Sequence, residues 1–394
     1  MPCRYAPFFK PKSAMRPKSH HPIAIDIILH YICIGMKVTI LYTTDTDGAK
    51  SIKNVAEDII TTHHTTASIL PITMGGSGFL DAAAENIEGC HCMTAGIRNR
   101  HAIANTAEYL ITKDGKTAYI EAFKACGFDP DDSNRNPAKA FTLGVGDLII
   151  DALRNGCRNF VIGIEELATI DAGIGMLNAI GYKILTPNGN ELPLYRGSEM
   201  LRAASIVDSE IAPLLKRCRF TVAINDDSAF YASTGPSMRH ARRLGANDVT
   251  TDILDNGLRN MVSLYFKHNG RDVSYIKGGG AGGGMAGALA SFFNAKLKAA
   301  TSIIPGAAHI NAALHKTDAV IIICDSITSA IATNIAFQYL ITPVRRKAIP
   351  IYCLARHTGD ITMLRNSGIT NAYATTDIPT GLLDLLDSMH KKSD

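Results

Sequence analysis

The stretch FVIGIEELATIDAGIGMLNAIG, residues 160–181, indicates the fold class of this chain. It opens with apolar or small residues at 160–163, which predict a buried strand. Small residues at 172–175 predict a tight turn, and Ile174, Leu177 and Ile180 then recur at helical spacing. A strand, a tight turn and a helix form the repeating unit of α/β proteins, where the helix start offers N–H groups to ligands.

Asp171 is the only carboxylate at this predicted helix start. A carboxylate in such a place serves either as a base for a bound substrate or as a cap that accepts helix N–H groups. The residues alone leave both roles open.

The rest of the chain repeats the alternation of strand and helix, which predicts largely parallel sheets. We expect strands at 37–44, 67–72, 220–224, 318–324 and 349–354, helices at 51–60, 81–85, 146–155 and 286–293, and a hairpin at 107–123 around Asp114-Gly115. A chain of 394 residues with 46% hydrophobic content is long enough for two domains.

The net charge of +4 lies entirely in the first 35 residues, which carry five Lys or Arg and one Asp. The balanced remainder argues against a nucleic-acid partner. Apolar runs stay shorter than the ~18 residues of a membrane span, so we expect no membrane partner. Residues 1–35 resemble a signal peptide only loosely. We therefore hypothesise that they are an untranslated extension ahead of a start at Met36.

The nine cysteines are odd in number and scattered, which predicts reduced thiols in a cytoplasmic protein. Cys90-His91-Cys92 has no second ligand pair at zinc spacing. We therefore expect no metal-ligating residues.

Six of the seven residues 278–284 are glycine, directly before an apolar helical segment. Such a loop is either a flexible linker or an anion-binding loop, and its continuation into a helix favours the anion. The cluster Arg239, His240, Arg242 and Arg243 is either a solvated helix face or a phosphate contact.

Acidic residues follow two of the predicted strands, Asp45 and Asp47 after the first and Asp226-Asp227 after 220–224. Ligands of parallel sheets bind outside these carboxyl ends. Asp226 and Asp227 either hold a cation or are solvated turn residues.

Several segments, in the same order, resemble the bacterial type I glycerate kinase family. DGKTAYIEAFKACGF (114–128) resembles its G-x-T-A-x-I-E-M-A-x-A-S-G-L, and residues 160–181 resemble its I-I-I-G-L-G-G-S-A-T-N-D-G-G-A-G-M-L-Q-A-L-G. RNP at 135–137, TLGVGDLI at 142–149, FTVAINDDSAF at 220–230 and GGGAGGGMAGAL at 278–289 have similar counterparts. The resemblance runs from Met36 to about Leu386.

The resemblance implies two α/β domains with mostly parallel sheets and an active-site cleft between them. A Rossmann-like domain would comprise 36–80 plus 291–394, and 81–290 would form an inserted second domain. It also implies Mg-ATP-dependent phosphorylation of a hydroxyl of D-glycerate or a related small hydroxy acid. The resemblance is also compatible with a homo-oligomer.

The resemblance also implies roles for individual residues. Asp171 falls on the aspartate expected to be the catalytic base. Nucleotide or phosphate binding falls on Thr169, Gly278, Gly280, Gly282, Gly283 and Gly284. Substrate binding falls on Asp45, Gly48, Gly75, Gly76, Gly78, Arg135 and Asp227.

Four family motifs are altered in this chain. Glu165-Glu166-Leu167 replaces a phosphate-cradling Gly-Gly-Ser, and Thr44–Gly48 lacks the lysine of D-S-F-K-G. Residues 73–78 lose two carboxylates and residues 322–331 lose most polar groups of their motifs. Two carboxylates repel a phosphate unless a metal intervenes. Two hypotheses follow: an active glycerate kinase, or a catalytically impaired paralogue that binds a small acid or acts as a partner protein.

Overall fold

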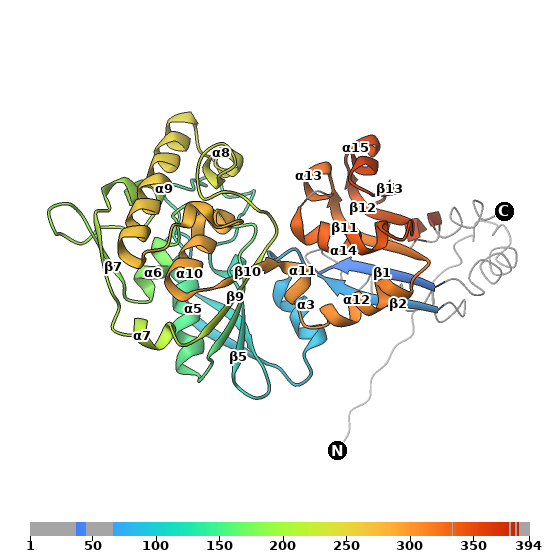
Figure 1. Cartoon of the computed structure of the whole chain (residues 1–394), viewed down its shortest axis with the longest axis horizontal. Helices are drawn as coiled ribbons and strands as arrows, with labels where there is room; N and C mark the ends of the chain where they lie inside the picture. Colours follow the sequence, from blue (N-terminus) through green and yellow to red (C-terminus); the bar gives the residue numbers. More distant parts are fainter. Residues whose placement is uncertain (1–36, 45–65, 333, 378–379, 383, 386–394) are drawn as a thin grey trace, which may run out of the picture.

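The structure is a computed structural model that describes residues 37–44, 66–332, 334–377, 380–382 and 384–385. Two α/β units lie side by side, each built on its own sheet (Figure 1). The predicted extension 1–35, the helix expected at 51–60, and Asp45, Asp47 and Gly48 lie outside the described residues. Among the helices that are described, none has both the length and the apolar character needed to cross a membrane.

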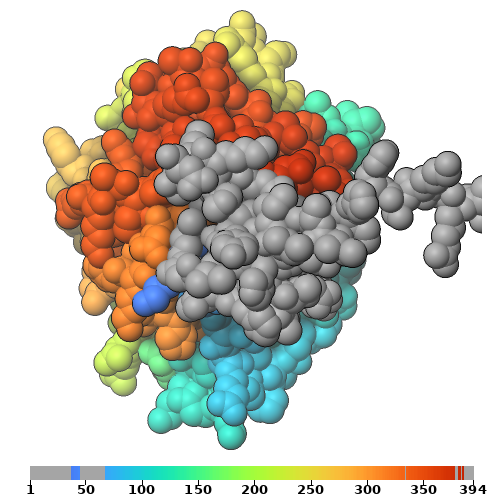
Figure 2. Space-filling view, turned by 90° about the vertical axis from the view of Figure 1, so that its right-hand side faces the viewer, coloured from blue at the N-terminus to red at the C-terminus, as the bar shows by residue number. Residues whose placement is uncertain are grey.

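The first unit has a five-stranded sheet in which every neighbouring pair is parallel. Its order is β13-β12-β11-β1-β2, from β1 (Lys37–Thr43), β2 (Thr66–Ile72), β11 (Ala319–Ile327), β12 (Ile351–Thr358) and β13 (Asn371–Ala374). Its helices are α3 (Phe79–Asn86), α11 (Ala300–Ile303), α12 (Ala307–Lys316), α13 (Ser329–Ala332), α14 (Ile335–Arg345) and α15 (Ile361–Asn366). Segments from both ends of the chain therefore lie side by side on this unit (Figure 2).

The second unit has a six-stranded sheet of order β10-β9-β6-β5-β4-β3, parallel except for β3 and β4. Its strands are β3 (His91–Arg98), β4 (Ala104–Ile111), β5 (Thr117–Glu121), β6 (Asn159–Gly163), β9 (Arg219–Ile224) and β10 (Lys296–Ala299). Its helices are α4 (Phe123–Cys126), α5 (Leu143–Arg154), α6 (Ile174–Ala179), α7 (Ala212–Leu215), α8 (Pro236–His240), α9 (Asp248–Asn269) and α10 (Met285–Phe293).

Shorter elements complete the second unit. A small hairpin pairs β7 (Lys183–Leu185) with β8 (Ser205–Val207), and three short 3-10 helices are η1 (Gly197–Arg202), η2 (Val273–Tyr275) and η3 (Ala281–Gly284).

The structure confirms the α/β class and the mostly parallel sheets. The predicted hairpin is the antiparallel pair β4–β5 around its Asp-Gly turn. One expected boundary is wrong: β10 pairs with β9, so the second unit continues past residue 290. The charged residues Lys296 and Lys298 in β10 hide its strand character in the sequence.

Stacked aromatic rings hold the strands that lead to the ligand side of the second unit. Phe160 of β6 lies opposite Phe220 of β9, with ring centroids 4.7 Å apart. Phe220 in turn stacks on Phe293 of α10 at 5.1 Å. All three rings are nearly or fully buried. This packing fixes β6, β9 and α10, so the loops attached to them are fixed as well.

Candidate functional site

A pocket of about 280 Å³ lies where the two units meet. Loops that follow β6 and β9 line it, together with the end of α8 and the glycine loop before α10. The first unit contributes Met74, Ala330, Ile331 and Asn334. The pocket therefore lies at the carboxyl ends of parallel strands, where α/β proteins bind ligands.

A larger hollow of about 520 Å³ on the α8–α9 surface is a weaker candidate. Its buried carboxylate, Asp255, already accepts hydrogen bonds from Ala232 N, Ser237 Oγ and Arg259 Nε. The guanidinium of Arg259 also stacks on Tyr231 at 4.5 Å. Because these groups are already paired, they do not point to a ligand.

Unpaired polar atoms mark the inter-unit pocket. Three buried oxygens of pocket residues have no hydrogen-bond partner among the residues that the structure describes: Thr169 Oγ1, Asn225 Oδ1 and Ser228 Oγ. Thr169 and Ser228 are only 1% and 2% exposed. Buried polar atoms are almost always paired in proteins, so three unpaired atoms in one pocket indicate a site for a polar ligand or water.

Basic side chains form one wall of the pocket. Arg239 Nη1 and His240 Nε2 lie 3.4 and 3.5 Å from Asp226 Oδ2. Arg243 lies over the ring of Phe128 at 4.8 Å. No carboxylate pairs with Arg243 among the residues that the structure describes. Its guanidinium is therefore available to an anion.

Asp226 is the ionised acid of the pocket. Burial acts to raise its pKa, but His240, the side chain and backbone N–H of Ser228, and the charge of Arg239 together hold the pKa at about 2. Asp226 thus carries a full negative charge at neutral pH and orients Arg239.

Glu165 lines the pocket and is held by the backbone of both units. Its Oε1 accepts a hydrogen bond from Asn225 N at 2.6 Å, and its own N–H donates to Gly75 O at 3.0 Å. Burial, followed by the negative charge of Asp226, raises the pKa of Glu165 to about 8. Glu165 is therefore mostly neutral at pH 7.

Glu166 also lines the pocket, but it is exposed. Its backbone is left-handed, with φ 58°, and its Oε2 accepts a hydrogen bond from Ser77 N at 3.2 Å. A Cβ at Gly76 would lie 2.7 Å from that oxygen. Both acids of the altered motif thus face the cleft, and backbone N–H groups bind both.

Asp171 lies in the core rather than in the pocket. It is 0% exposed and is absent from the pocket wall. Its Oδ2 accepts hydrogen bonds from Thr142 Oγ1 at 2.7 Å, Thr142 N at 3.1 Å and Gly175 N at 3.3 Å. Its Oδ1 accepts one from Gly173 N at 2.9 Å. Burial raises the pKa of Asp171 to about 6 despite these donors.

This geometry gives Asp171 a structural role that the sequence left open. Thr142 immediately precedes α5, and Gly173 is the N-cap residue of α6. One carboxylate therefore joins the starts of two helices, and it has no surface from which to reach a substrate. In this structure Asp171 caps both helix starts, and its role as a base stays a prediction.

The glycine loop is ordered and packs tightly on the protein. Gly280, Gly282 and Gly283 line the pocket, as expected for a ligand-binding loop. A Cβ at Gly283 would lie 2.1 Å from Thr169 O. Gly278 and Gly284 instead lie against protein atoms away from the pocket, including Ile224 and Ala172, respectively. The expectation of phosphate contact therefore keeps structural support at three of the five glycines.

Substitution of Gly280 tests this packing. An added Cβ would lie 2.0 Å from Ala229 O, while the backbone, with φ −77°, suits any residue. We expect Gly280→Ala to lower the free energy of unfolding by about 1–3 kcal/mol through overpacking. Urea denaturation measures this. Gly96→Ala is the control because no atom of the described residues lies within 4 Å of its Cβ position; equal losses in both variants would contradict the packing.

The described residues expected to bind substrate near β2 form a supporting turn. Gly75 accepts the N–H of Glu165 through its carbonyl, and Gly76 leaves room for Glu166. Gly78 is the N-cap of α3, with φ 77°. None of the three lines the pocket, whereas the preceding Met74 does.

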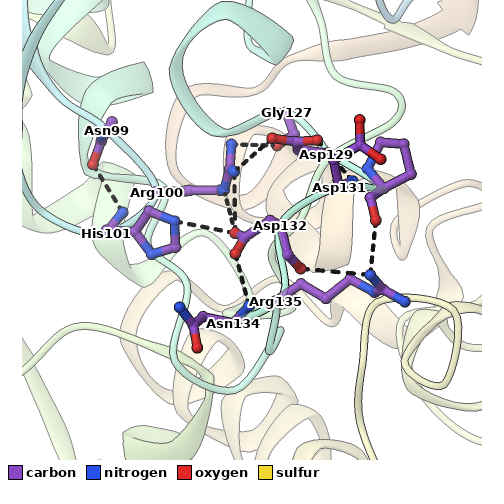
Figure 3. Close-up of polar contacts among 10 residues, drawn as sticks. Asn99, Arg100, His101, Gly127, Asp129, Asp131, Asp132, Asn134 and Arg135 are labelled. Atoms are coloured by element: carbon purple, nitrogen blue, oxygen red, sulfur yellow. Dashed lines mark hydrogen bonds and ion pairs between the residues drawn. The ribbon is translucent and has the colours of Figure 1, made fainter.

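Two other expected substrate contacts are directed elsewhere. Asp227 Oδ2 lies 3.3 Å from Lys277 Nζ in an exposed ion pair, while its neighbour Asp226 lines the pocket. Arg135 Nη1 donates to Pro130 O at 2.8 Å in a separate acidic loop, where Arg100 pairs with Asp132 at 3.1 Å (Figure 3). Arg135 therefore braces that loop.

The sequence did not predict Asn225, Ser228 and Asn334 as pocket residues. The residues next to them in the sequence form no motif that would have indicated a ligand. The sequence did indicate the basic cluster Arg239, His240, Arg242 and Arg243, because phosphate contact was one of the two interpretations of that cluster. Within the described part of the chain, no group of three or more His, Cys, Asp or Glu side chains could hold a metal ion.

The sequence and the fold also resemble those of known proteins. The profile of the Glycerate kinase family matches residues 44–392. This chain belongs to the glycerate kinase family. Curated relatives include Glycerate 2-kinase of Escherichia coli K12, 33% identical over 256 residues, and Glycerate kinase of Halalkalibacterium halodurans, 29% identical over 257 residues. Each match covers 64% of this chain and 66% of the relative, so about a third of each relative lies outside the match.

A solved structure supports the fold of this family member. It is described as a candidate glycerate kinase 2 from Salmonella typhimurium LT2, and it is 23% identical. The two structures superpose with a TM-score of 0.69, over 91% of this chain and 99% of the other. At that identity the likeness shows a shared fold.

Proposed function

We propose that this protein phosphorylates a hydroxyl of D-glycerate, or of a related small hydroxy acid, in the inter-unit pocket with ATP as the phosphate donor. One observation supports the proposal. Among the described residues, the pocket brings together three polar atoms without hydrogen-bond partners and one arginine, Arg243, without a carboxylate partner. A three-carbon acid with two hydroxyls and a carboxylate offers matching partners to each.

In this proposal Arg243 binds the carboxylate of the substrate. A guanidinium forms charge-assisted hydrogen bonds with carboxylates, and stacking on Phe128 restricts its orientation. Thr169 and Ser228 bind the hydroxyls, since each offers one O–H donor and acceptor lone pairs. Asn225 accepts a hydrogen bond from one of these hydroxyls through its unpaired Oδ1.

The acid pair 165–166 is compatible with anions because it carries one charge rather than two near pH 7. Glu165 is mostly neutral there, and Asp226 is paired with Arg239. Arg239 balances the charge of Asp226, which leaves Arg243 available to the substrate carboxylate. The repulsion expected from the sequence is therefore much reduced.

The binding of ATP and Mg²⁺ is a separate part of this proposal. Gly280, Gly282 and Gly283 would lie closest to the phosphates, and Glu166 and Asp226 are the pocket carboxylates that could share Mg²⁺ with them. When bound, Mg²⁺ neutralises charge on the transferring phosphoryl group. The residues of this chain position the acceptor hydroxyl and exclude water.

The second candidate function is that of an impaired paralogue that binds a small acid or acts as a partner protein. The acids 165–166 favour it, since they line the pocket where the family motif has small residues. A coupled assay of ADP release with D-glycerate and Mg-ATP separates the two. Turnover that depends on D-glycerate supports the kinase. Thermal stabilisation by D-glycerate without turnover supports the impaired paralogue.

The ionisation of Glu165 predicts a pH dependence of substrate binding. As the pH rises through about 8, Glu165 becomes charged and repels the anion. We expect the Kd for D-glycerate to increase by about tenfold between pH 7 and pH 9, a change of about 1.4 kcal/mol. In Glu165→Gln the Kd should stay nearly constant. Calorimetric titration measures both proteins, and a wild-type Kd that is independent of pH would refute this role.

A further inference from the structure

We propose that Glu121, at the end of β5, is a positioning residue that holds the start of α3 and the turn 74–78 against the pocket. The proposal rests on the proposed function of that pocket. In this proposal Glu121 does not contact the substrate. It acts through the backbone of α3.

Glu121 caps a helix that belongs to the other unit. It is only 3% exposed, and its Oε2 accepts a hydrogen bond from Leu80 N at 2.9 Å. Leu80 lies in the first turn of α3, whose N-cap, Gly78, supplies no side-chain bond. The first N–H groups of a helix need outside acceptors. Glu121 provides one of them from across the junction.

The same junction carries the pocket wall. Glu121 lies in register with Gly163, whose carbonyl accepts the N–H of Ala122 at 2.9 Å. Gly163 is so close to the turn that a Cβ there would lie 2.7 Å from Gly75 O. Gly75 O also accepts the N–H of Glu165. A displacement of α3 would therefore move both Met74 and Glu165 in the pocket.

Glu121 also titrates in a useful range. Burial raises its pKa to about 7, although the N–H of Leu80 and the charge of Lys124 act to lower it and Asp81 acts to raise it. Ionisable side chains on the elements packed around it are Asp81 and Glu85 on α3, Glu108 and Tyr109 on β4, Tyr119 on β5, Lys124 and Cys126 on α4, and Asp147, Asp151 and Arg154 on α5. β6 carries none.

The sign of the effect follows from the raised pKa. The folded state holds the proton more tightly than the unfolded chain, whose value is near 4.5. The stability that Glu121 contributes is therefore complete below about pH 4.5 and is lost as the pH rises through about 7. We expect the junction to open more readily above that pH.

Hydrogen exchange of residues 74–80 tests the proposal without substrate. We expect protection in the wild type, corrected for intrinsic exchange, to fall at least about fivefold between about pH 5.5 and about pH 8.5. Glu121→Gln should show a clearly smaller pH step, because glutamine keeps an acceptor oxygen without ionising; the step that remains belongs to Glu165, whose N–H binds Gly75 O and whose pKa is about 8. Glu88→Gln, which changes an exposed glutamate after α3, should behave as the wild type.

Two results would overturn the proposal. One is a Glu121→Gln variant that keeps the pH step of the wild type. The other is a variant that loses protection at both pH values, because the carboxylate would then be a purely structural group. Failure of the proposed kinase activity would appear as absent turnover with this exchange pattern intact, so the two failures are distinguishable.

Discussion

Replacing Asp171 by alanine is expected to lower the free energy of unfolding by about 3–5 kcal/mol. The side chain is fully buried, and its two oxygens accept hydrogen bonds from Thr142, Gly173 and Gly175. Without the carboxylate these donors stay buried and unpaired, and the starts of α5 and α6 lose their common anchor. Urea denaturation followed by circular dichroism measures the loss.

A control separates this role from a general effect of removing a carboxylate. Asp252→Ala removes an exposed aspartate of α9 and should change stability by less than about 0.5 kcal/mol. A different outcome would support Asp171 as a base: an Asp171→Ala variant as stable as the wild type but without turnover. The present geometry predicts loss of stability first and loss of activity through it.

The second large effect is expected at Arg243. Arg243→Met keeps an apolar chain over Phe128 but removes the charge that binds the substrate carboxylate. A charge-assisted hydrogen bond contributes about 1.5–3 kcal/mol, so the KM for D-glycerate should rise roughly 10- to 100-fold. The kcat should fall much less, because the interaction is present in the ground state and the transition state alike.

Arg242→Met is the matched control for this variant. Arg242 is the adjacent residue, but its guanidinium lies on the surface, 2.8 Å from Asp248 Oδ1. Steady-state kinetics of ADP release should give it a KM close to that of the wild type. Equal KM values for the two variants would place the substrate carboxylate elsewhere.

The sequence predicted the fold well because hydrophobic periodicity determines it. The buried runs at Phe160–Gly163 and 319–324 became central strands, since strands covered on both faces need continuous apolar residues. The strand β10 escaped prediction because it is short and half of its residues are lysine. Packing against β9, rather than local propensity, makes it a strand.

The site was harder to predict because side-chain direction depends on tertiary contacts. Asp226 and Asp227 are adjacent and chemically identical, yet one lines the pocket and the other pairs with Lys277 on the surface. Asp171 kept its place in the family motif, but the sequence could not show that Thr142 would cover it. Thr169 was predicted to bind a nucleotide or phosphate, and the structure shows that it lines the pocket with an unpaired hydroxyl.

The sequence overstated the negative charge of the acid pair Glu165-Glu166. Glu165 and Glu166 read as two negative charges beside a phosphate site. In the structure Glu165 is half-buried and its Oε1 accepts a hydrogen bond from Asn225 N, whereas Glu166 is exposed. Burial shifts one of them toward its neutral form, which no sequence pattern reveals.

Phosphorus NMR of the wild-type protein with D-glycerate and Mg-ATP tests the proposed kinase activity most directly. We expect resonances of ADP and of a new phosphomonoester that grow with time, and that grow much more slowly in Arg243→Met at low substrate concentration. Unchanged ATP resonances in a sample whose protein is folded and binds D-glycerate would rule out this activity.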